Sequence, residues 1–500
     1  MTLVEILERN AKDIPGKVAI IYHDLRMTYG ELNEAVNRLA YALLDLGLMK
    51  GDRVGLMLPR IPELITGFLG VAKAQGIVAP VNFELRDEDI RTVLNNLSPR
   101  FLIVHESFID LAKRSIPQNL RISIVVVGNR CNEGDYLWDD IMRNRKISNP
   151  ALEVREDGVV YFNYTSGSTG NPKGAITTHS NIFWNTLAAV DTLKLTPSDV
   201  HLCLFAPFAH PHEIFARSLY LGGTVVLLDK IRPRSIVQTI SENKVTCFMG
   251  LAPMYETLLQ VAGSERYDLS SLRIVESGGM HTKVELMKRF ERSFGVPILP
   301  VWGSTEATGI AIANSPDGRL VYGSLGKACK FYEVEIVDVS GKELPPNKVG
   351  EMIFKGPAVV SGYYEVSEED QRTFKNGWYY SGDLGRKDED GYFYFVGRKS
   401  GMIKVAGLRV YPLEVELALM CHPHIEEAAV IGVKDRLRGE VPKAIVVLDD
   451  GLRMTEREII KFCGEQIAHY KIPRLVEFRK YLPKIGSGKI DKKALRMEVA

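Results

Sequence analysis

Residues 164–174 read Tyr-Thr-Ser-Gly-Ser-Thr-Gly-Asn-Pro-Lys-Gly, a segment with three glycines, four serine or threonine hydroxyls and one lysine. Glycines allow a backbone to curl until its N–H groups converge on one concave space. The hydroxyls add further donors and the lysine adds a mobile positive charge. Segments of this composition are more often flexible surface loops, but the ligand that this one suits best is a polyphosphate.

The flanks of the segment predict strands on both sides. Residues 159–164 and 175–178 are rich in β-branched and aromatic side chains, so the loop is expected to join two strands. A Walker A loop instead carries Ser or Thr directly after its lysine and opens into a helix. Here Gly174 follows Lys173, so the segment is a different kind of phosphate loop.

Composition bounds the class of protein. The chain has 500 residues, of which 45% are hydrophobic and 25% charged, which is typical of two to four globular domains. Its formal net charge of +1 provides no global field for nucleic acid or an anionic membrane. The N-terminus mixes charges and lacks the apolar core of a signal peptide, and Lys73 and Gln75 interrupt the most apolar stretch, residues 64–83. We therefore expect no transmembrane segment.

The cysteines indicate a reducing compartment. Six are scattered along the chain without a Cys-x-x-Cys pair, so neither a disulfide framework nor a zinc site is expected. The cytoplasm is the predicted location.

Alternating helix and strand signals fill the first part of the chain. Thr28 and Glu31 form a potential capping box, after which apolar residues recur every three or four positions until Gly47. This pattern predicts an amphipathic helix, and strands are predicted at residues 54–58, 224–228 and 273–276. Such alternation is typical of layered α/β structure.

The pattern changes after about residue 325. Residues 332–337 and 392–396 alternate polar and apolar side chains, which predicts antiparallel hairpins or a small β-barrel-like region. A short segment of small and polar residues follows near residue 400, and beyond it lies a compact unit with helix signals. We expect an α/β fold with a large N-terminal domain of layered α/β subdomains plus this barrel-like region (1–398), a hinge (399–401) and a small α+β C-terminal domain (402–500).

Four more segments combine unusual residues. They are Trp302-Gly-Ser-Thr-Glu306, Tyr380-Ser-Gly-Asp383, Gly397-Arg398 and a glycine-bounded lysine in Pro483-Lys-Ile-Gly-Ser-Gly-Lys489. In this order, after the loop at 164–174, they resemble the motifs of the adenylate-forming superfamily: acyl-CoA synthetases, adenylation domains of peptide synthetases, and luciferases. The resemblance extends over essentially the whole chain.

The resemblance implies two half-reactions. A carboxylic acid first reacts with ATP to give acyl-AMP and pyrophosphate, and a thiol, here that of CoA, then takes the acyl group. Mg²⁺ is the implied metal cofactor. In such transfers positioning and charge neutralisation dominate over covalent help from the protein.

The nucleotide-binding residues follow from the matching motifs. Thr305 would contact the α-phosphate, Glu306 would serve Mg²⁺, and Trp302 stands where the family usually has a tyrosine that stacks on adenine. The other residues implied to bind the nucleotide are Thr165, Ser166, Gly167, Ser168, Thr169, Gly170 and Lys173 (phosphates), Gly278, Gly279, Met280 and Gly303 (adenine side), and Asp383 and Arg398 (ribose).

The C-terminal domain is implied to be mobile. Lys489 matches the family's adenylation lysine, which bridges the attacking carboxylate and the α-phosphate. After rotation, Lys404 and Gly407 would serve thioester formation, with CoA's pantetheine passing Gly407. Ser400 lies at the hinge where many members have Asp or Lys, a difference that concerns the rate of rotation.

The acid pocket has the weakest signals. His210 matches a Pro-x-x-His segment that often lines the acyl site in the family. The alternative that His210 has only a structural role is left open. Gly250 and Leu251 are expected to line the same pocket, whose apolar character suits an aromatic or aliphatic acid. His212 and Arg217 offer a further alternative, a site for a second carboxylate, although such charges are more often paired.

The leading hypothesis is a carboxylate–CoA ligase with a small-molecule acid, ATP and CoA as its partners. The alternative is a stand-alone adenylation enzyme that loads a carrier-protein thiol; the chain carries no carrier domain, and residues 207–213 lack the Phe-Asp pair typical of amino-acid selection. A nucleotide-binding scaffold without chemistry and a luciferase-like oxygenase are further options. No nucleic-acid partner is expected, and a homodimer is left open.

Overall fold

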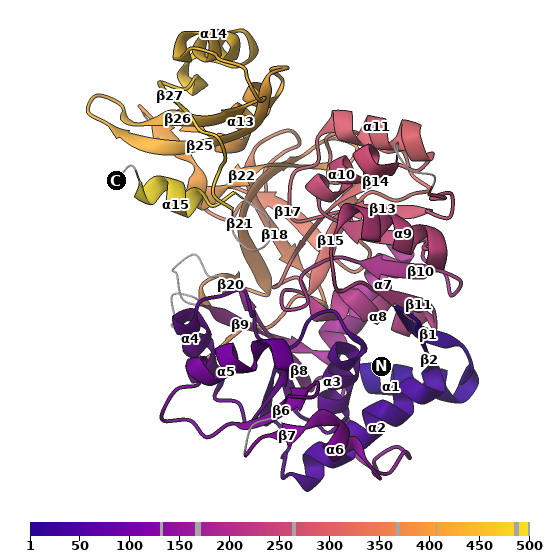
Figure 1. Ribbon diagram of the computed structural model, residues 1–500. Coiled ribbons are helices and arrows are strands. Elements are labelled where there is room, and N and C mark those ends of the chain that lie inside the picture. The colour runs from indigo at the N-terminus through magenta and orange to yellow at the C-terminus, as the bar shows by residue number, and fades with distance from the viewer. Residues whose placement is uncertain are drawn as a thin grey trace. The chain divides into compact units, whose positions relative to one another are not determined.

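A computed structural model describes residues 1–130, 134–165, 172–262, 267–366, 371–406, 408–484 and 490–498 (Figure 1). The chain divides into two compact units. The first unit comprises Met1–Glu333 and Phe354–Tyr379, and the second comprises Val334–Ile353 and Tyr380–Ala500.

The first unit contains a nine-stranded sheet whose centre is parallel. Strands β14, β13, β12, β10, β11 and β1 are parallel neighbours in that order, and antiparallel strands β15 and β16 at one end and β2 at the other extend the sheet. The strands are β1 (Val18–Tyr22), β2 (Leu25–Thr28), β10 (Val200–Cys203), β11 (Thr224–Leu227), β12 (Cys247–Gly250), β13 (Ile274–Ser277), β14 (Ile298–Ser304), β15 (Gly309–Ala313) and β16 (Lys327–Ala328).

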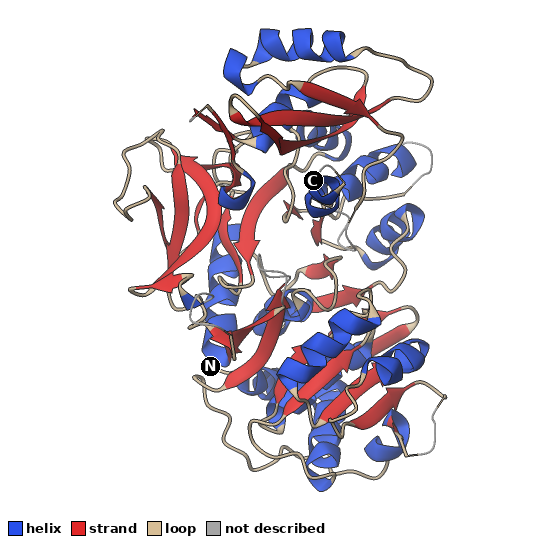
Figure 2. Cartoon of the chain, turned by 90° about the vertical axis from the view of Figure 1, so that its left-hand side faces the viewer, coloured by secondary structure: helices blue, strands red, loops and turns tan. Residues whose placement is uncertain are grey.

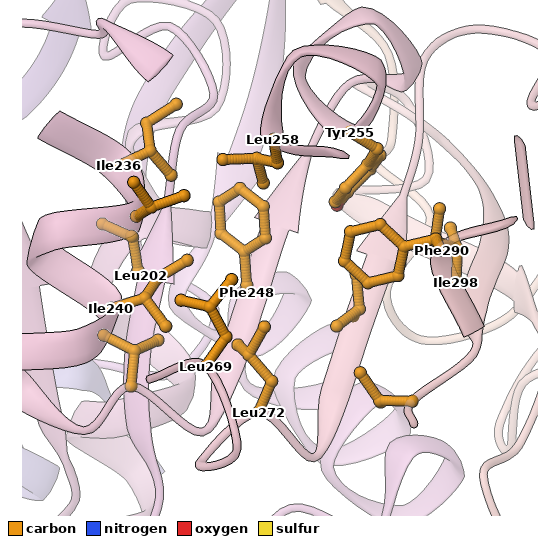
Figure 3. Close-up of a cluster of buried hydrophobic side chains, with 14 of the residues drawn as sticks. Leu202, Ile236, Ile240, Phe248, Tyr255, Leu258, Leu269, Leu272, Phe290 and Ile298 are labelled. Carbon is orange, nitrogen blue, oxygen red and sulfur yellow. The ribbon is translucent and has the colours of Figure 1, made fainter. Parts of the chain in front are cut away.

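Alternate residues of these strands face two different layers. Leu202, Phe248 and Val275 point into a hydrophobic core beneath three amphipathic helices: α9 (Pro233–Asn243), α10 (Ala252–Ala262) and α11 (Val284–Phe294) (Figure 3). Within that core the ring of Phe248 meets Tyr255, which in turn meets Phe290, each pair at 5.4 Å between centroids. The opposite face of the sheet carries the intervening residues toward α8 (Pro211–Leu221).

A second, eight-stranded sheet has the order β19-β9-β8-β4-β3-β5-β6-β7. Its strands β8 and β9 pair antiparallel, with Thr165 opposite Lys173, so the prediction that the glycine-rich loop joins two strands is confirmed. The loop residues 166–171 lie outside the described residues. The strands are β3 (Arg53–Met57), β4 (Ile77–Pro80), β5 (Phe101–His105), β6 (Ser123–Val127), β7 (Tyr136–Leu137), β8 (Val159–Thr165), β9 (Lys173–Thr178) and β19 (Tyr363–Tyr364).

The predicted capping box begins a helix as expected. The Thr28 side chain accepts from the backbone N–H of Glu31, and the Glu31 carboxylate accepts from the backbone N–H of Thr28, so α2 (Tyr29–Asp45) is capped reciprocally. The remaining helices of the first unit are α1 (Leu3–Asp13), α3 (Pro62–Lys73), α4 (Asp87–Leu97), α5 (Ile109–Ser115), α6 (Trp138–Met142) and α7 (His179–Leu193).

Hairpins follow after residue 325, as the alternating pattern predicted. Five strands form one sheet of order β17-β18-β21-β20, with β22 also on β21; the β20–β21 and β21–β22 pairs are antiparallel. The strands are β17 (Glu333–Val337), β18 (Gly350–Lys355), β20 (Phe374–Lys375), β21 (Trp378–Lys387) and β22 (Phe393–Arg398).

The C-terminal part of the second unit is α+β (Figure 2). Its sheet has the order β24-β23-β26-β25, with β27 parallel to β26. The elements are β23 (Ile403–Val405), β24 (Leu408–Val410), α13 (Pro412–Met420), β25 (Ile425–Asp435), β26 (Gly439–Leu448), α14 (Glu456–Gln466), β27 (Leu475–Phe478) and α15 (Lys492–Met497). The predicted fold class is thus confirmed.

The predicted hinge, residues 399–401, forms one short 3₁₀ turn, η2 (Lys399–Gly401), between β22 and β23. The domain limits 1–398 and 402–500 stay predictions. In the described part of the chain, no helix combines the length and apolar character needed to cross a bilayer, and Cys203, Cys247, Cys329, Cys421 and Cys463 are free thiols.

Candidate functional site

Four predicted site segments converge at the carboxyl edge of the nine-stranded sheet. The segment leading to His210 follows β10, Gly250 ends β12, residues 278–280 follow β13, and Trp302 and Gly303 lie in the last residues of β14. Because these four strands are parallel neighbours, their carboxyl ends share one edge. Ligands of open α/β sheets bind in the crevice outside this edge.

Two glycines at this edge lie close to neighbouring residues. A Cβ at Gly303 would lie 2.5 Å from the carbonyl oxygen of Gly309, at the point where the β14–β15 register shifts. A Cβ at Gly278 would lie 3.1 Å from Val301 Cγ2 and 3.4 Å from Cζ of the Phe205 ring. A side chain at residue 303 would clash with backbone, whereas one at residue 278 would require Val301 to move by a few tenths of an ångström.

Glu306, the predicted magnesium ligand, is held by two tyrosines. It lies with Thr305 in the turn after β14 and is only 8% exposed. The hydroxyl of Tyr363 donates to its Oε1 at 2.7 Å, and that of Tyr379 donates to its Oε2 at 3.0 Å. The carboxylate is therefore fixed in orientation, while each oxygen retains further acceptor capacity. Sequence reasoning missed both tyrosines, because no motif marks them.

Lys173 lies beside the same tyrosine. It is buried at the start of β9, and its Nζ lies 5.7 Å from the centroid of the Tyr363 ring. Strand β19 brings Tyr363 there, because it pairs with Ala175 of β9. The structure thus brings together the predicted phosphate-binding lysine and the predicted magnesium carboxylate. Thr165 lies half-buried opposite Lys173, and Ser166, Gly167, Ser168, Thr169 and Gly170 lie outside the described residues.

Trp302 is packed within the first unit. Its indole is 7% exposed and stacks in parallel on the ring of Phe354, with centroids 4.0 Å apart. Phe354 therefore covers one face of the indole. The adenine-stacking role of Trp302 stays a prediction.

His210 and His212 differ in their surroundings. His210 precedes α8 and is half-buried, with its Nδ1 3.5 Å from the Asn163 amide nitrogen. His212 is buried between the Tyr161 hydroxyl (2.8 Å from Nδ1) and the Thr308 carbonyl (2.7 Å from Nε2). Because a carbonyl only accepts, Nε2 carries the proton and Nδ1 accepts from Tyr161. Burial lowers the pKa of His212 to about 4, so this histidine is neutral.

Arg217 is committed to two carboxylates of the chain itself. Its Nη1 donates to both oxygens of Glu276, at 2.8 and 2.9 Å, and its Nη2 donates to Glu213 at 2.7 Å. Burial alone would lower the pKa of Arg217, but the two carboxylates outweigh burial and raise this pKa. For Glu276, an acid, burial raises the pKa. The alternative that Arg217 binds a second substrate carboxylate is therefore wrong.

The predicted ribose pair lies in the second unit. Asp383 and Arg398 are opposite each other in the β21–β22 ladder, and Arg398 Nε lies 2.8 Å from Asp383 Oδ1. The Arg398 side chain remains 69% exposed, whereas Asp383 is buried. Lys404 is exposed on β23, where its backbone N–H donates to Glu440 at 2.9 Å. Gly407 and Lys489 lie outside the described residues.

The chain is similar to known nucleotide-dependent enzymes over nearly its full length. Residues 7–364 match the family described as AMP-binding enzyme, and residues 414–489 match the AMP-binding enzyme C-terminal domain. A long-chain-fatty-acid–CoA ligase of Bacillus subtilis (strain 168) is 32% identical, over 99% of this chain and 94% of its own length. A feruloyl-CoA synthase of Amycolatopsis sp is 33% identical, over 98% and 97%.

A solved structure shares the fold. The anthranilate CoA ligase AuaEII, crystallised in complex with anthranoyl-AMP, superposes with a TM-score of 0.91 at 32% identity, covering 100% of this chain and 97% of its own.

Proposed function

The chain belongs to the AMP-binding enzyme family, as an acyl-CoA synthetase of the adenylate-forming superfamily, and we propose how its residues carry out the reaction. An AMP-forming carboxylate–CoA ligase activates a carboxylic acid with ATP and then forms acyl-CoA. The observation that carries the proposal is the cluster of Lys173, Tyr363 and Glu306 beside the carboxyl edge of the sheet.

In the first half-reaction a carboxylate oxygen attacks the α-phosphorus of ATP while the bond to the β-phosphate oxygen breaks. The hydroxyls of Thr165, Ser166, Ser168 and Thr169 donate hydrogen bonds to the β- and γ-phosphates, and the Lys173 cation stabilises the departing pyrophosphate. Thr305 contacts the α-phosphate. Lys489 places its cation between the carboxylate and the α-phosphate, which at about 4 Å repel by several kcal/mol in a partly dry site. Positioning and charge neutralisation lower the barrier.

The residues around Glu306 fit Mg²⁺. This ion prefers oxygen ligands and is usually bound by one or two carboxylates together with phosphates and water. Within the described ranges no group of three or more His, Cys, Asp or Glu side chains could hold a metal ion. Glu306 is proposed as the single protein carboxylate, which is sufficient when phosphates and water supply the other ligands. When bound, the ion supplies charge neutralisation at the phosphates, and the Tyr363 and Tyr379 hydroxyls keep the carboxylate oriented.

Two sets of residues are assigned to the adenine and to the ribose of the nucleotide. Trp302, Gly303 and residues 278–280 bind the adenine. Asp383 accepts hydrogen bonds from the ribose hydroxyls, and Arg398 assists because it fixes the Asp383 carboxylate.

In the second half-reaction the CoA thiol attacks the acyl-adenylate carbonyl, the carbon–oxygen bond to the phosphate breaks, and AMP leaves. We assign the change between the half-reactions to rotation of residues 402–500 about Ser400. Lys404 and Gly407 then replace Lys489 in serving the reaction, and the absence of a side chain at 407 lets the pantetheine pass.

The acid is proposed to be an apolar monocarboxylic acid. His210, Gly250 and Leu251 border the pocket, and Arg217 is bound by Glu213 and Glu276. The relatives named for a long-chain fatty acid and for a feruloyl group support an aliphatic or aromatic substrate. We also propose a cytoplasmic location, which the scattered cysteines support. A homodimer is proposed as well, and sedimentation tests it.

A panel of acids tests the function. Short, long, aromatic and dicarboxylic acids are each incubated with ATP, Mg²⁺ and CoA, and pyrophosphate release and thioester are measured. Apolar monocarboxylic acids are expected to be the best substrates. Absence of acid-dependent pyrophosphate release would refute the proposed reaction. If the acyl group were transferred only to the phosphopantetheine thiol of a carrier protein, that thiol and not CoA would be the acceptor.

A further inference from the structure

Three charged side chains of the first unit are buried together between α8 and the nine-stranded sheet. The side chains of Glu213, Arg217 and Glu276 are 3%, 5% and 2% exposed, and the guanidinium makes three hydrogen bonds to the two carboxylates. Glu213 and Arg217 lie one helical turn apart on α8, and Glu276 lies on β13. We call these residues the ionic triad.

Burial of charge is not the cheapest way to hold a helix against a sheet. Well-packed apolar side chains of similar volume are often as stable as a buried ion pair or more so. What the charged groups add is direction, since the fixed N–H donors of a planar guanidinium reach carboxylate oxygens only in defined positions. The ionic triad therefore specifies how α8 and β13 lie relative to each other.

The first turn of α8 also contacts the turn that carries Glu306. Nε2 of His212 donates to the carbonyl of Thr308 at 2.7 Å. Glu213 Oε1 lies 2.2 Å from the place where a Cβ of residue 309 would be, so only glycine fits there. Thr308 has a positive φ of 58°, an uncommon conformation for a threonine that these contacts help to maintain.

The ionic triad therefore connects two segments proposed to bind ATP. Through Glu276 it contacts the end of β13, immediately before residues 277–280. Through Glu213 it lies against residue 309, three positions after Glu306. Helix α8 adds this connection to the direct pairing of β13 with β14, which also joins the two segments through the sheet. In sequence, Glu276 lies 59 residues from Arg217, and Thr308 lies 96 residues from His212.

The surroundings exclude a direct chemical role for Arg217. The cavity beside the ionic triad has a volume of about 10 Å³ and is lined by His201, Cys203, Cys247 and Met249 among others. That volume accommodates one water molecule at most. Arg217 Nε and His201 Nε2 are buried there without a hydrogen-bond partner in the described part of the chain, and no substrate group fits between them.

We propose that Arg217 is a positioning residue for adenylation, which holds the adenine segment after β13 and the Glu306 turn in their mutual arrangement through Glu276 and Glu213. The inference rests on the proposed function of this site. Arg217 touches no substrate and acts only through its two carboxylates.

The experiment compares Arg217→Met with a matched control, Arg273→Met. Arg273 pairs with buried Asp199 and directly precedes β13, at the opposite edge of the same sheet. Carboxylate-dependent pyrophosphate release, thioester formation from supplied acyl-adenylate, and thermal stability are measured for each. Arg217→Met is expected to lose about 10²-fold in kcat/KM for adenylation, the effect of a misplacement near 1 Å. Arg273→Met is expected to lose stability without this loss of rate, and Arg217→Lys to restore adenylation in part.

A variant without the three buried charges, the neutral variant, controls for misfolding. Glu213→Gln, Arg217→Met and Glu276→Gln together leave no buried charge unpaired, so this protein is expected to fold and still adenylate slowly. Wild-type adenylation in the folded neutral variant would overturn the proposal. So would equal losses in Arg217→Met and Arg273→Met at equal stability. Failure of the proposed function is distinguishable, because the wild-type enzyme itself would then release no pyrophosphate with any acid.

Discussion

Acidification is expected to destabilise the first unit through three buried histidines. Burial lowers the pKa of His179, His201 and His212 from 6.5 to about 4 each. Between these two values the unfolded chain binds protons that the folded unit excludes, so stability is complete above the unfolded pKa and falls as the pH drops through it. Below the folded pKa the loss is complete.

The size of the effect follows from proton counting. Near pH 5.5 each of these histidines carries about 0.9 proton in the unfolded chain and almost none in the folded unit, which gives about 1.2 kcal/mol per pH unit for each. Burial also lowers the pKa of His105 and His281, which act in the same direction. Half-buried Glu63 and buried Glu276 have raised pKa values and act in the opposite direction, so the difference between variants is the quantity to measure.

His212→Gln isolates one contribution. A glutamine can accept from the Tyr161 hydroxyl and donate to the Thr308 carbonyl, as the neutral histidine does, but it does not titrate. We expect the slope of unfolding free energy against pH near 5.5 to fall by about 1.2 kcal/mol per pH unit relative to wild type.

Tryptophan fluorescence during urea unfolding is a suitable assay. All four tryptophans, Trp138, Trp184, Trp302 and Trp378, lie in the first unit. The three histidines lie in the same unit. The signal therefore reports the unit that contains the titrating groups, whatever the second unit does. Identical slopes for wild type and His212→Gln would refute the argument that His212 is neutral because it is buried.

Three further substitutions test the proposed chemistry. Lys489→Ala is expected to lower carboxylate-dependent pyrophosphate release by about 10²–10³-fold, the effect of losing one focused electrostatic contact. Thioester formation from supplied acyl-adenylate should barely change, and unimpaired adenylation would reject the role of Lys489. Lys404→Ala should show the opposite pattern, with Lys404→Arg as its charge-conserving control; equal losses in both half-reactions would contradict the proposed rotation. Glu306→Gln keeps the shape of a side chain that accepts from Tyr363 but removes its charge, so the Mg²⁺ concentration for half-maximal pyrophosphate release should rise, and an unchanged Mg²⁺ dependence would argue against metal binding at Glu306.

Local signals in the sequence predicted local structure well. The Thr28–Glu31 capping box and the apolar spacing predict α2 because both act within a few residues. The strands on each side of the glycine-rich loop were predicted for the same reason, and their antiparallel pairing follows from the short connection. The segments near residues 250, 278 and 302 meet at one edge because their strands are parallel neighbours. This order of strands could not be predicted from spacing in the sequence.

The partners of the site residues could not be predicted from the sequence. Tyr363 and Tyr379 lie 57 and 73 residues from Glu306, and neither belongs to a recognisable motif. For Arg217, the sequence indicated no particular partner; Glu213 lies four residues before it on α8, a spacing at which helical side chains can pair. The pairing with Glu276 depends on how α8 packs against β13, which is a property of tertiary structure.

Tyr363 explains how two opposite charges are arranged at one place. Its ring lies beside the Lys173 ammonium group, which is attracted by the π-face, and its hydroxyl donates to the Glu306 carboxylate. Strand β19 fixes this side chain by pairing with β9, the strand that begins with Lys173. A rigid aromatic residue therefore sets the spacing between cation and anion. A nucleotide polyphosphate with its divalent ion needs such a pair, since the lysine attracts the phosphates and the carboxylate attracts the metal ion.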